Sequence, residues 1–174
     1  MSGIMCERSG VINIAIEGMM LTGAMIAVIF SSITGSLWLG LGAAVIASGI
    51  LGVFLAILAI RFRVDQIIAG TAINIFALGI TSFISQRFLQ TNPDLNSGGV
   101  FQKIAIPGLS QIPILGPIFF NQTPIVYLLF LTIIAIHFML FYTRWGLRTR
   151  AVGEHPRAAD TLGVNVFKIR YINV

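Results

Sequence analysis

The sequence has 174 residues, of which 56% are hydrophobic and only 10% are charged, and its mean hydropathy is +0.93. A soluble chain of this length needs far more polar surface, so the composition is typical of an integral membrane protein. The net charge of +5 does not indicate a nucleic-acid partner, because the basic residues lie between apolar runs and form no basic domain. The single cysteine, Cys6, excludes an intrachain disulfide and a CxxC metal site, and we interpret it as a bystander.

The first apolar segment carries polar residues that are costly in lipid. Between Gly10 and Gly18 the chain reads VINIAIE, so two helix-weakening glycines bracket an apolar stretch that holds Asn13 and Glu17. This pattern is typical of a broken membrane segment that lines a solute path, since an intramembrane carboxylate usually faces protein or water. Two alternatives remain open: Glu17 caps the start of a helix, and Asn13 hydrogen bonds to a neighbouring backbone group.

Four stretches are apolar over the length of about 20 residues that a helix needs to cross a bilayer. The expected fold is therefore an all-α, polytopic membrane protein with one transmembrane domain. Five of the six prolines fall between the third and fourth stretches and disfavour a continuous helix there. We predict an external loop at residues 87–124, with an interfacial or re-entrant portion. The predicted spans cover residues 11–33, 37–60, 66–86 and 125–142.

Small residues recur every four positions along the second predicted span. Residues at this spacing lie on one helical face, and small side chains let another helix approach closely. We therefore expect this face to pack on a neighbouring helix. The alternative is chance, because glycine and alanine are common in membrane helices. The face consists of Gly40, Ala44, Ser48, Gly52 and Ala56.

One face of the third predicted span carries two amides with a small residue between them. Gln66, Gly70 and Asn74 follow at four-residue intervals, and Thr71 lies beside them. Two carboxamides supply both donors and acceptors, which recognition of a polyhydroxylated or heterocyclic solute requires. The alternative, given equal weight, is hydrogen bonding between helices. The candidate residues of a solute path are therefore Asn13, Glu17, Gln66, Thr71 and Asn74.

The sequence shows no catalytic signature. It contains no HExxH, GxSxG or P-loop motif. His137, in the fourth predicted span, has no acidic neighbour at helical spacing and is interpreted as structural. We therefore predict that the protein is not an enzyme, has no catalytic or metal-binding residues, and needs no cofactor of its own.

The basic residues predict the orientation in the membrane. If the first span starts in the cytoplasm, all but two of the 11 basic residues lie on that side. The two exceptions are Arg87 and Lys103. This asymmetry follows the positive-inside rule. The turn at Arg61 and the segment at residues 144–170 are thus expected to be cytoplasmic.

The segment after the fourth predicted span has the signals of a short, capped helix. Pro156 suits a first helical turn, Ala158 and Ala159 favour helix, and Gly163 suits the stop. A short helix of this kind between spans can dock into the groove of a soluble partner. Its sequence, RAADTLG, resembles the EAA-type loop by which ABC importer permeases contact their ATPase, with Arg157 in place of the usual glutamate.

Three blocks of the chain resemble the permease subfamily for simple sugars and nucleosides, in the branched-chain amino acid permease-like superfamily. Residues 146–165 are similar to its pattern GLR-x-RAVGE-x-PRAAD-x-x-G-x-N. The stretch ERSGVINIAIEGMML is similar to its opening signature, and residues 65–74 to its next block. The resemblance implies ATPase-coupling roles for Gly153, Glu154, Pro156, Arg157, Ala158, Ala159, Asp160 and Gly163.

The resemblance implies a permease subunit of an ABC importer in the cytoplasmic membrane that moves a nucleoside or simple sugar. The implied partners are an ATPase subunit that hydrolyses the ATP, a second permease subunit, an extracytoplasmic solute-binding protein and the lipid bilayer. Such permeases usually carry a helix before the first block and several spans after the last, so we expect a chain truncated at both ends. The alternatives are a branched-chain amino acid permease and a non-transporting membrane scaffold, which has no need of a coupling helix.

Overall fold

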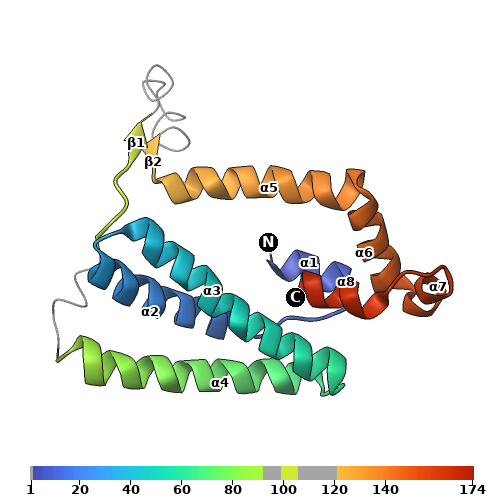
Figure 1. Ribbon diagram of the computed structural model, residues 1–174, viewed down its shortest axis with the longest axis horizontal. Coiled ribbons are helices and arrows are strands. Elements are labelled where there is room, and N and C mark those ends of the chain that lie inside the picture. The colour runs from blue at the N-terminus through green and yellow to red at the C-terminus, as the bar shows by residue number, and fades with distance from the viewer. Residues whose placement is uncertain (1, 92–98, 106–120) are drawn as a thin grey trace.

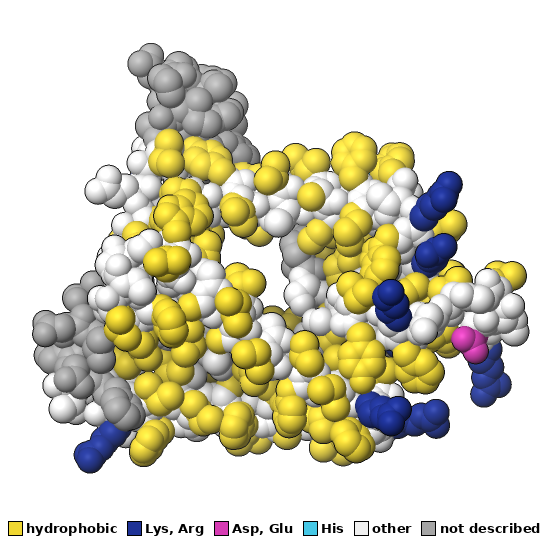
Figure 2. All heavy atoms as spheres, in the orientation of Figure 1, with side chains coloured by type: hydrophobic (Ala, Val, Ile, Leu, Met, Phe, Trp, Pro, Cys, Tyr) yellow, Lys and Arg dark blue, Asp and Glu magenta, His cyan; other side chains and the backbone are white. Residues whose placement is uncertain are grey.

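The computed structural model describes residues 2–91, 99–105 and 121–174. Four long helices dominate it (Figure 1): α2 (Ile16–Thr34), α3 (Leu37–Ala56), α4 (Gln66–Ile84) and α5 (Pro124–Tyr142). Each is long and apolar enough to cross a membrane. The span of α3 continues through the next helical turns to Arg61, and the span of α4 continues to Arg87. Apolar side chains cover these helices in Figure 2. The predicted all-α, polytopic fold is therefore confirmed.

Shorter elements connect and flank the long helices. The two strands form a small antiparallel pair, and the hydroxyl of Tyr127 on α5 donates a hydrogen bond to the carbonyl of Ile104 at 3.1 Å. Most of the predicted external loop, including its re-entrant portion, lies outside the described residues. The short elements are α1 (Ser2–Arg8), η1 (Ile57–Arg61), η2 (Ser85–Leu89), β1 (Ile104–Ala105), β2 (Asn121–Gln122), α6 (Arg144–Glu154), α7 (Pro156–Thr161) and α8 (Val166–Asn173).

Helix α2 is the centre of a three-helix group. It packs on both α3 and α4, whereas α5 lies apart from these three helices and packs on α6 (Figure 1). The short helices α1 and α8 lie side by side in the space between α5 and α3. The main apolar core forms where the start of α2 meets the other two helices of the group, and it contains Ala15, Leu55, Ala69 and Ile73.

The predicted small-residue face of α3 lies against α2 over most of its length. A Cβ atom added to Gly40 would come within 2.7 Å of the carbonyl oxygen of Ala27 on α2. One turn after Ala44, the hydroxyl of Ser48 donates a hydrogen bond to the carbonyl of Met19 at 3.0 Å. Further along the face, Gly52 approaches the carboxyl end of the chain and Ala56 is buried in a second apolar cluster. The contacts at Gly40 and Ser48 bring the two backbones close together.

Leucine at Gly40 should destabilise the chain by about 1–3 kcal/mol, because a side chain there forces α2 and α3 apart. The matched control is Gly42→Leu on the same helix, where an added Cβ atom meets nothing within 4 Å. Thermal unfolding of the detergent-solubilised protein measures both. If the two variants unfold at the same temperature, close approach at Gly40 contributes nothing to stability.

The first span begins later than predicted. We expected helix from Val11, but α2 begins at Ile16, and residues 9–15 form a non-helical segment between α1 and α2. The cause is Gly10, whose φ of +80° ends α1 in a left-handed turn, with hydrogen bonds from the Gly10 amide to Glu7 and from the Val11 amide to Cys6. The break indicated by the two glycines is therefore present, and the membrane helix starts after it.

The short helix expected after the fourth span is also present. Helix α7 begins with Pro156 in its first turn, and the chain leaves the helical path at Gly163, whose φ is +78°. Proline needs no amide partner at a helix start, and glycine adopts the left-handed conformation without steric cost. The predicted start and stop agree with the structure.

Candidate functional site

The non-helical segment lies along α4 and is fixed there by side-chain amides. The Ile12 amide donates a hydrogen bond to Oε1 of Gln66 at 2.6 Å. Asn74 donates from Nδ2 to the carbonyl of Ile14 at 3.0 Å and accepts at Oδ1 from the Gly18 amide at 2.8 Å. The side chains of Gln66 and Asn74 thus supply hydrogen-bond partners for backbone groups that have no partner within an extended segment.

The residue between the two amides lets the segment approach α4. A Cβ atom on Gly70 would lie 2.9 Å from Cβ of Ile14 and 3.2 Å from the amide nitrogen of Ala15. We call Gln66, Gly70 and Asn74 the amide face. Gly70 lets the segment lie against α4, and the two side-chain amides form hydrogen bonds to its backbone. Non-helical backbone is tolerated at membrane depth only where protein or water satisfies its polar groups. The amide face meets that requirement for the amide of Ile12 and the carbonyl of Ile14.

The other predicted solute-path residues on these helices are exposed. Thr71 directs its hydroxyl to the carbonyls of Ile67 and Ile68 in its own helix, at 2.9 and 3.0 Å. Glu17 lies in the first turn of α2, where the helix dipole favours a negative charge. The structure does not bring Glu17 or Thr71 into the amide contacts. A role for these residues in a solute path stays a prediction.

Asn13 and Cys6 form a buried polar contact that links the two ends of the chain. Asn13 is only 7% exposed, and its Nδ2 lies 3.9 Å from the sulfurs of both Cys6 and Met19. The Cys6 thiol donates to the carbonyl of Asn173 at 3.2 Å, and the Asn173 amide donates to the hydroxyl of Thr149 at 3.2 Å. Burial raises the pKa of the Cys6 thiol. Cys6 is therefore buried in the packing between α1, α6 and α8, an environment that agrees with the interpretation of Cys6 as a bystander and not a reactive thiol.

The segment at residues 144–170 touches the non-helical segment directly. A Cβ atom on Gly10 would lie 3.5 Å from Cα of Gly153, and an added side chain on Gly153 would collide with the carbonyl of Arg8. Nε of Arg170 donates to the carbonyl of Ser9 at 3.2 Å. Sequence reasoning assigned Gly153 to partner contact and missed Ser9 and Arg170, because no local pattern shows a contact across 161 residues. This arrangement joins α6 and α8 to the segment held by the amide face.

Helix α7 presents a different face from the one expected. We expected Ala158 and Ala159 to offer a small surface to a partner, but Ala159 is 3% exposed and packs with Val152 and Ile169. Its methyl group holds α7 onto α6 and α8 of the same chain. The exposed residues of this region include Glu154, Arg157, Ala158, Asp160 and Leu162.

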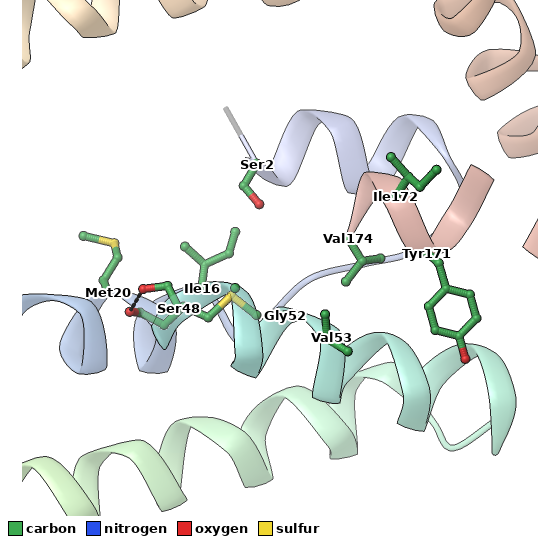
Figure 3. A pocket seen from close by; sticks show the side chains of 11 residues that line it. Ser2, Ile16, Met20, Ser48, Gly52, Val53, Tyr171, Ile172 and Val174 are labelled. Atoms are coloured by element: carbon green, nitrogen blue, oxygen red, sulfur yellow. Dashed lines mark hydrogen bonds between the residues drawn. The ribbon is translucent and has the colours of Figure 1, made fainter. Parts of the chain in front are cut away.

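A cavity of about 470 Å³ lies between α1, α2, α3 and α8 (Figure 3). Its lining is mostly apolar, with Met19, Met20 and Val53 beside Ser2 and Ser48. The Ser48 hydroxyl is already used by the carbonyl of Met19. None of the predicted solute-path residues lines this cavity. The described residues also contain no group of three or more His, Cys, Asp or Glu side chains that could hold a metal ion.

Comparison with known proteins identifies the relatives of the chain. The family model described as "Branched-chain amino acid transport system / permease component" matches residues 1–174. The guanosine ABC transporter permease protein of Bacillus subtilis is 44% identical over 100% of this chain and 57% of its own length. The nucleoside ABC transporter permease protein of Lactococcus lactis is 35% identical over 99% of this chain and 56% of its own length.

A third relative is the putative glucose ABC transporter permease protein of Haloferax volcanii, 35% identical over 98% of this chain and 52% of its own length. The chain therefore spans about half the length of the curated relatives it matches. No solved structure matches it. The family match and the four long apolar helices together confirm the resemblance found in the sequence. The chain belongs to the permease-component family of the branched-chain amino acid transport system and is a multi-pass protein of the cytoplasmic membrane.

Proposed function

We propose that this chain is part of the permease subunit of an ABC importer for nucleosides or related simple sugars, powered by ATP hydrolysis in a separate subunit. The printed names of its relatives, which refer to guanosine, nucleoside and glucose transport, support this solute class. A branched-chain amino acid is the second candidate, because the family description names it. A non-transporting scaffold is less well supported, since these relatives are transporter permeases.

The observation that carries the proposal is the contact between the 144–170 segment and the non-helical segment. Gly153 lies against Gly10, and Arg170 is hydrogen bonded to Ser9. The other end of the non-helical segment is held by Asn74. In an importer, a movement of the partner-binding segment has to reach the backbone that borders the solute path. This chain of contacts provides a direct physical route.

The exposed residues of α7 are the proposed ATPase-docking surface. Leu162, which directly follows α7, is 83% exposed, and Arg157, Ala158 and Asp160 on α7 are exposed as well. A partner that covers Leu162 would give the interface an apolar centre with a polar rim, which is the usual arrangement. On the opposite side of the membrane we propose a solute-binding protein, with a second permease subunit completing the path.

Tryptophan at Ala158 should prevent the ATPase subunits from copurifying with the assembled transporter and should abolish guanosine uptake. Ala158 is exposed on α7, so a bulky side chain there blocks docking without disturbing the buried contact of Ala159. Ala135→Trp, exposed on α5, is the matched control. Copurification and uptake of labelled guanosine, with excess unlabelled nucleoside, glucose or leucine as competitors, measure the result. Unchanged copurification would refute the docking surface, and competition by leucine alone would refute the solute class.

A further inference from the structure

A second cavity, of about 400 Å³, lies where the turn between η1 and α4 meets α7 and α8. Its lining brings together Arg63, Arg157, Arg170 and Asp160, with Ile60 and Phe167 as the main apolar members. Volumes of this size hold small organic ligands. We propose that the cavity binds the glycerophosphate head of an anionic phospholipid. The proposal does not depend on the solute, but it shares Arg157 and Asp160 with the proposed ATPase-docking surface, so its test includes ATPase copurification.

The charge of the cavity favours an anion. The lining contains three arginines and one aspartate, and among the residues that the structure describes these four side chains form no ion pair with one another. Nε of Arg170 donates a hydrogen bond to the carbonyl of Ser9, and its Nη2 lies 3.3 Å from a Cβ atom built on Gly10, so this guanidinium is held beside the non-helical segment and keeps its charge. Guanidinium groups bind phosphate oxygens through paired hydrogen bonds. A phosphate group would therefore supply negative charge that balances the arginines of the cavity.

The backbone at Arg63 is held in a conformation that is costly for this residue. Its φ is 54°, the only positive value at a non-glycine residue in the described part of the chain. Left-handed backbone at a long side chain costs free energy and persists only where the surrounding structure imposes it. Here it places an arginine on the wall of the cavity at the end of the α3 span. Strained residues of this kind are concentrated at binding sites.

The position of the cavity favours a lipid over a free anion. The α3 span ends at Arg61 and the α4 span begins at Gln66, so the cavity lies at the level where two spans leave the bilayer. Phe167 is 58% exposed beside it and offers an apolar surface to an acyl chain. Basic side chains also gather at this end of the molecule in Figure 2. Basic pockets at this depth bind anionic head groups.

Asp160 in the lining favours a lipid head group that carries hydroxyl groups. A carboxylate on the wall accepts hydrogen bonds and repels a second negative charge. Glycerol hydroxyls of phosphatidylglycerol can donate to Asp160 while the phosphate binds the arginines. The choline group of phosphatidylcholine has no such donor. A lining that contains arginine side chains and one carboxylate therefore fits phosphatidylglycerol.

The test compares unfolding temperatures of the full chain in nanodiscs of phosphatidylcholine and in nanodiscs of an equal mixture with phosphatidylglycerol. The wild type should gain about 4 °C or more in the mixture, because a ligand that binds only the folded state stabilises it. Arg63→Gln and Arg157→Gln should each lose most of that gain. Arg61→Gln, exposed on the same turn but outside the cavity, should keep it.

Three results would overturn the proposal. An equal gain in all the variants would show a general effect of membrane charge. The same gain from soluble glycerol 3-phosphate in phosphatidylcholine nanodiscs would assign the cavity to a free phosphate and not to a lipid. The third result has two parts: the Arg63→Gln chain gains the normal stabilisation from phosphatidylglycerol, and the same variant in the assembled transporter no longer copurifies with the ATPase. That result would assign the arginines to an acidic protein partner.

Discussion

Leucine in place of Gly153 is expected to abolish solute uptake by the assembled importer while the ATPase subunits stay bound. A side chain at this position collides with the carbonyl of Arg8 and comes within 3.4 Å of the Gly10 amide nitrogen. The contact between α6 and the non-helical segment must then open. Coupling between sites typically amounts to about 1–3 kcal/mol, so loss of this contact should reduce uptake by about 5- to 150-fold. ATP hydrolysis should persist without stimulation by solute.

The control for Gly153 is Ala151→Leu, because Ala151 is exposed on the same helix. A Gly153→Ala variant should be intermediate, since its smaller side chain opens the contact less. The unfolding temperature of each variant distinguishes loss of coupling from loss of folding. Solute-stimulated hydrolysis in a normally folded Gly153→Leu protein would show that movement reaches the solute path by another route.

Much of the fold could be predicted because membrane helices are defined by length and apolarity. The second, third and fourth spans were recognised from uninterrupted apolar runs, and the ends of α7 from Pro156 and Gly163. These signals are local: a proline ring fixes φ at a helix start, and a glycine permits the left-handed turn at its end. They depend on no distant part of the chain.

The late start of α2 could not be predicted in the same way. An apolar run with one amide is compatible with helix, and the extended alternative needs, besides the turn at Gly10, hydrogen bonds with the distant side chains of Gln66 and Asn74. The burial of Ala159 and Cys6 likewise depends on α8 packing against distant elements. The sequence showed which polar residues were unusual, but it did not show whether their partners were solute, lipid or backbone.

Leucine in place of Asn74 is expected to destabilise the chain by about 2–4 kcal/mol and to abolish uptake by the assembled importer. The variant leaves the carbonyl of Ile14 and the amide of Gly18 without the partners they have in the structure. Both hydrogen bonds are partly buried, so each group left without a partner should cost about 1–2 kcal/mol, the lower part of the usual range. Membrane insertion should be retained, because leucine makes α4 more apolar. Thermal unfolding and uptake of labelled guanosine measure the two effects.

The matched control for Asn74→Leu is Thr71→Val on the same helix. The Thr71 hydroxyl bonds only to carbonyls of its own helix and is exposed, so the change should lie within about 0.5 kcal/mol of neutral. Gln66→Leu, which removes one hydrogen bond, should fall between the two. If Asn74→Leu loses uptake but unfolds at the wild-type temperature, the amide contacts solute and the amide face is part of the path. If it loses both, the principal role of Asn74 is to hold the non-helical segment in place.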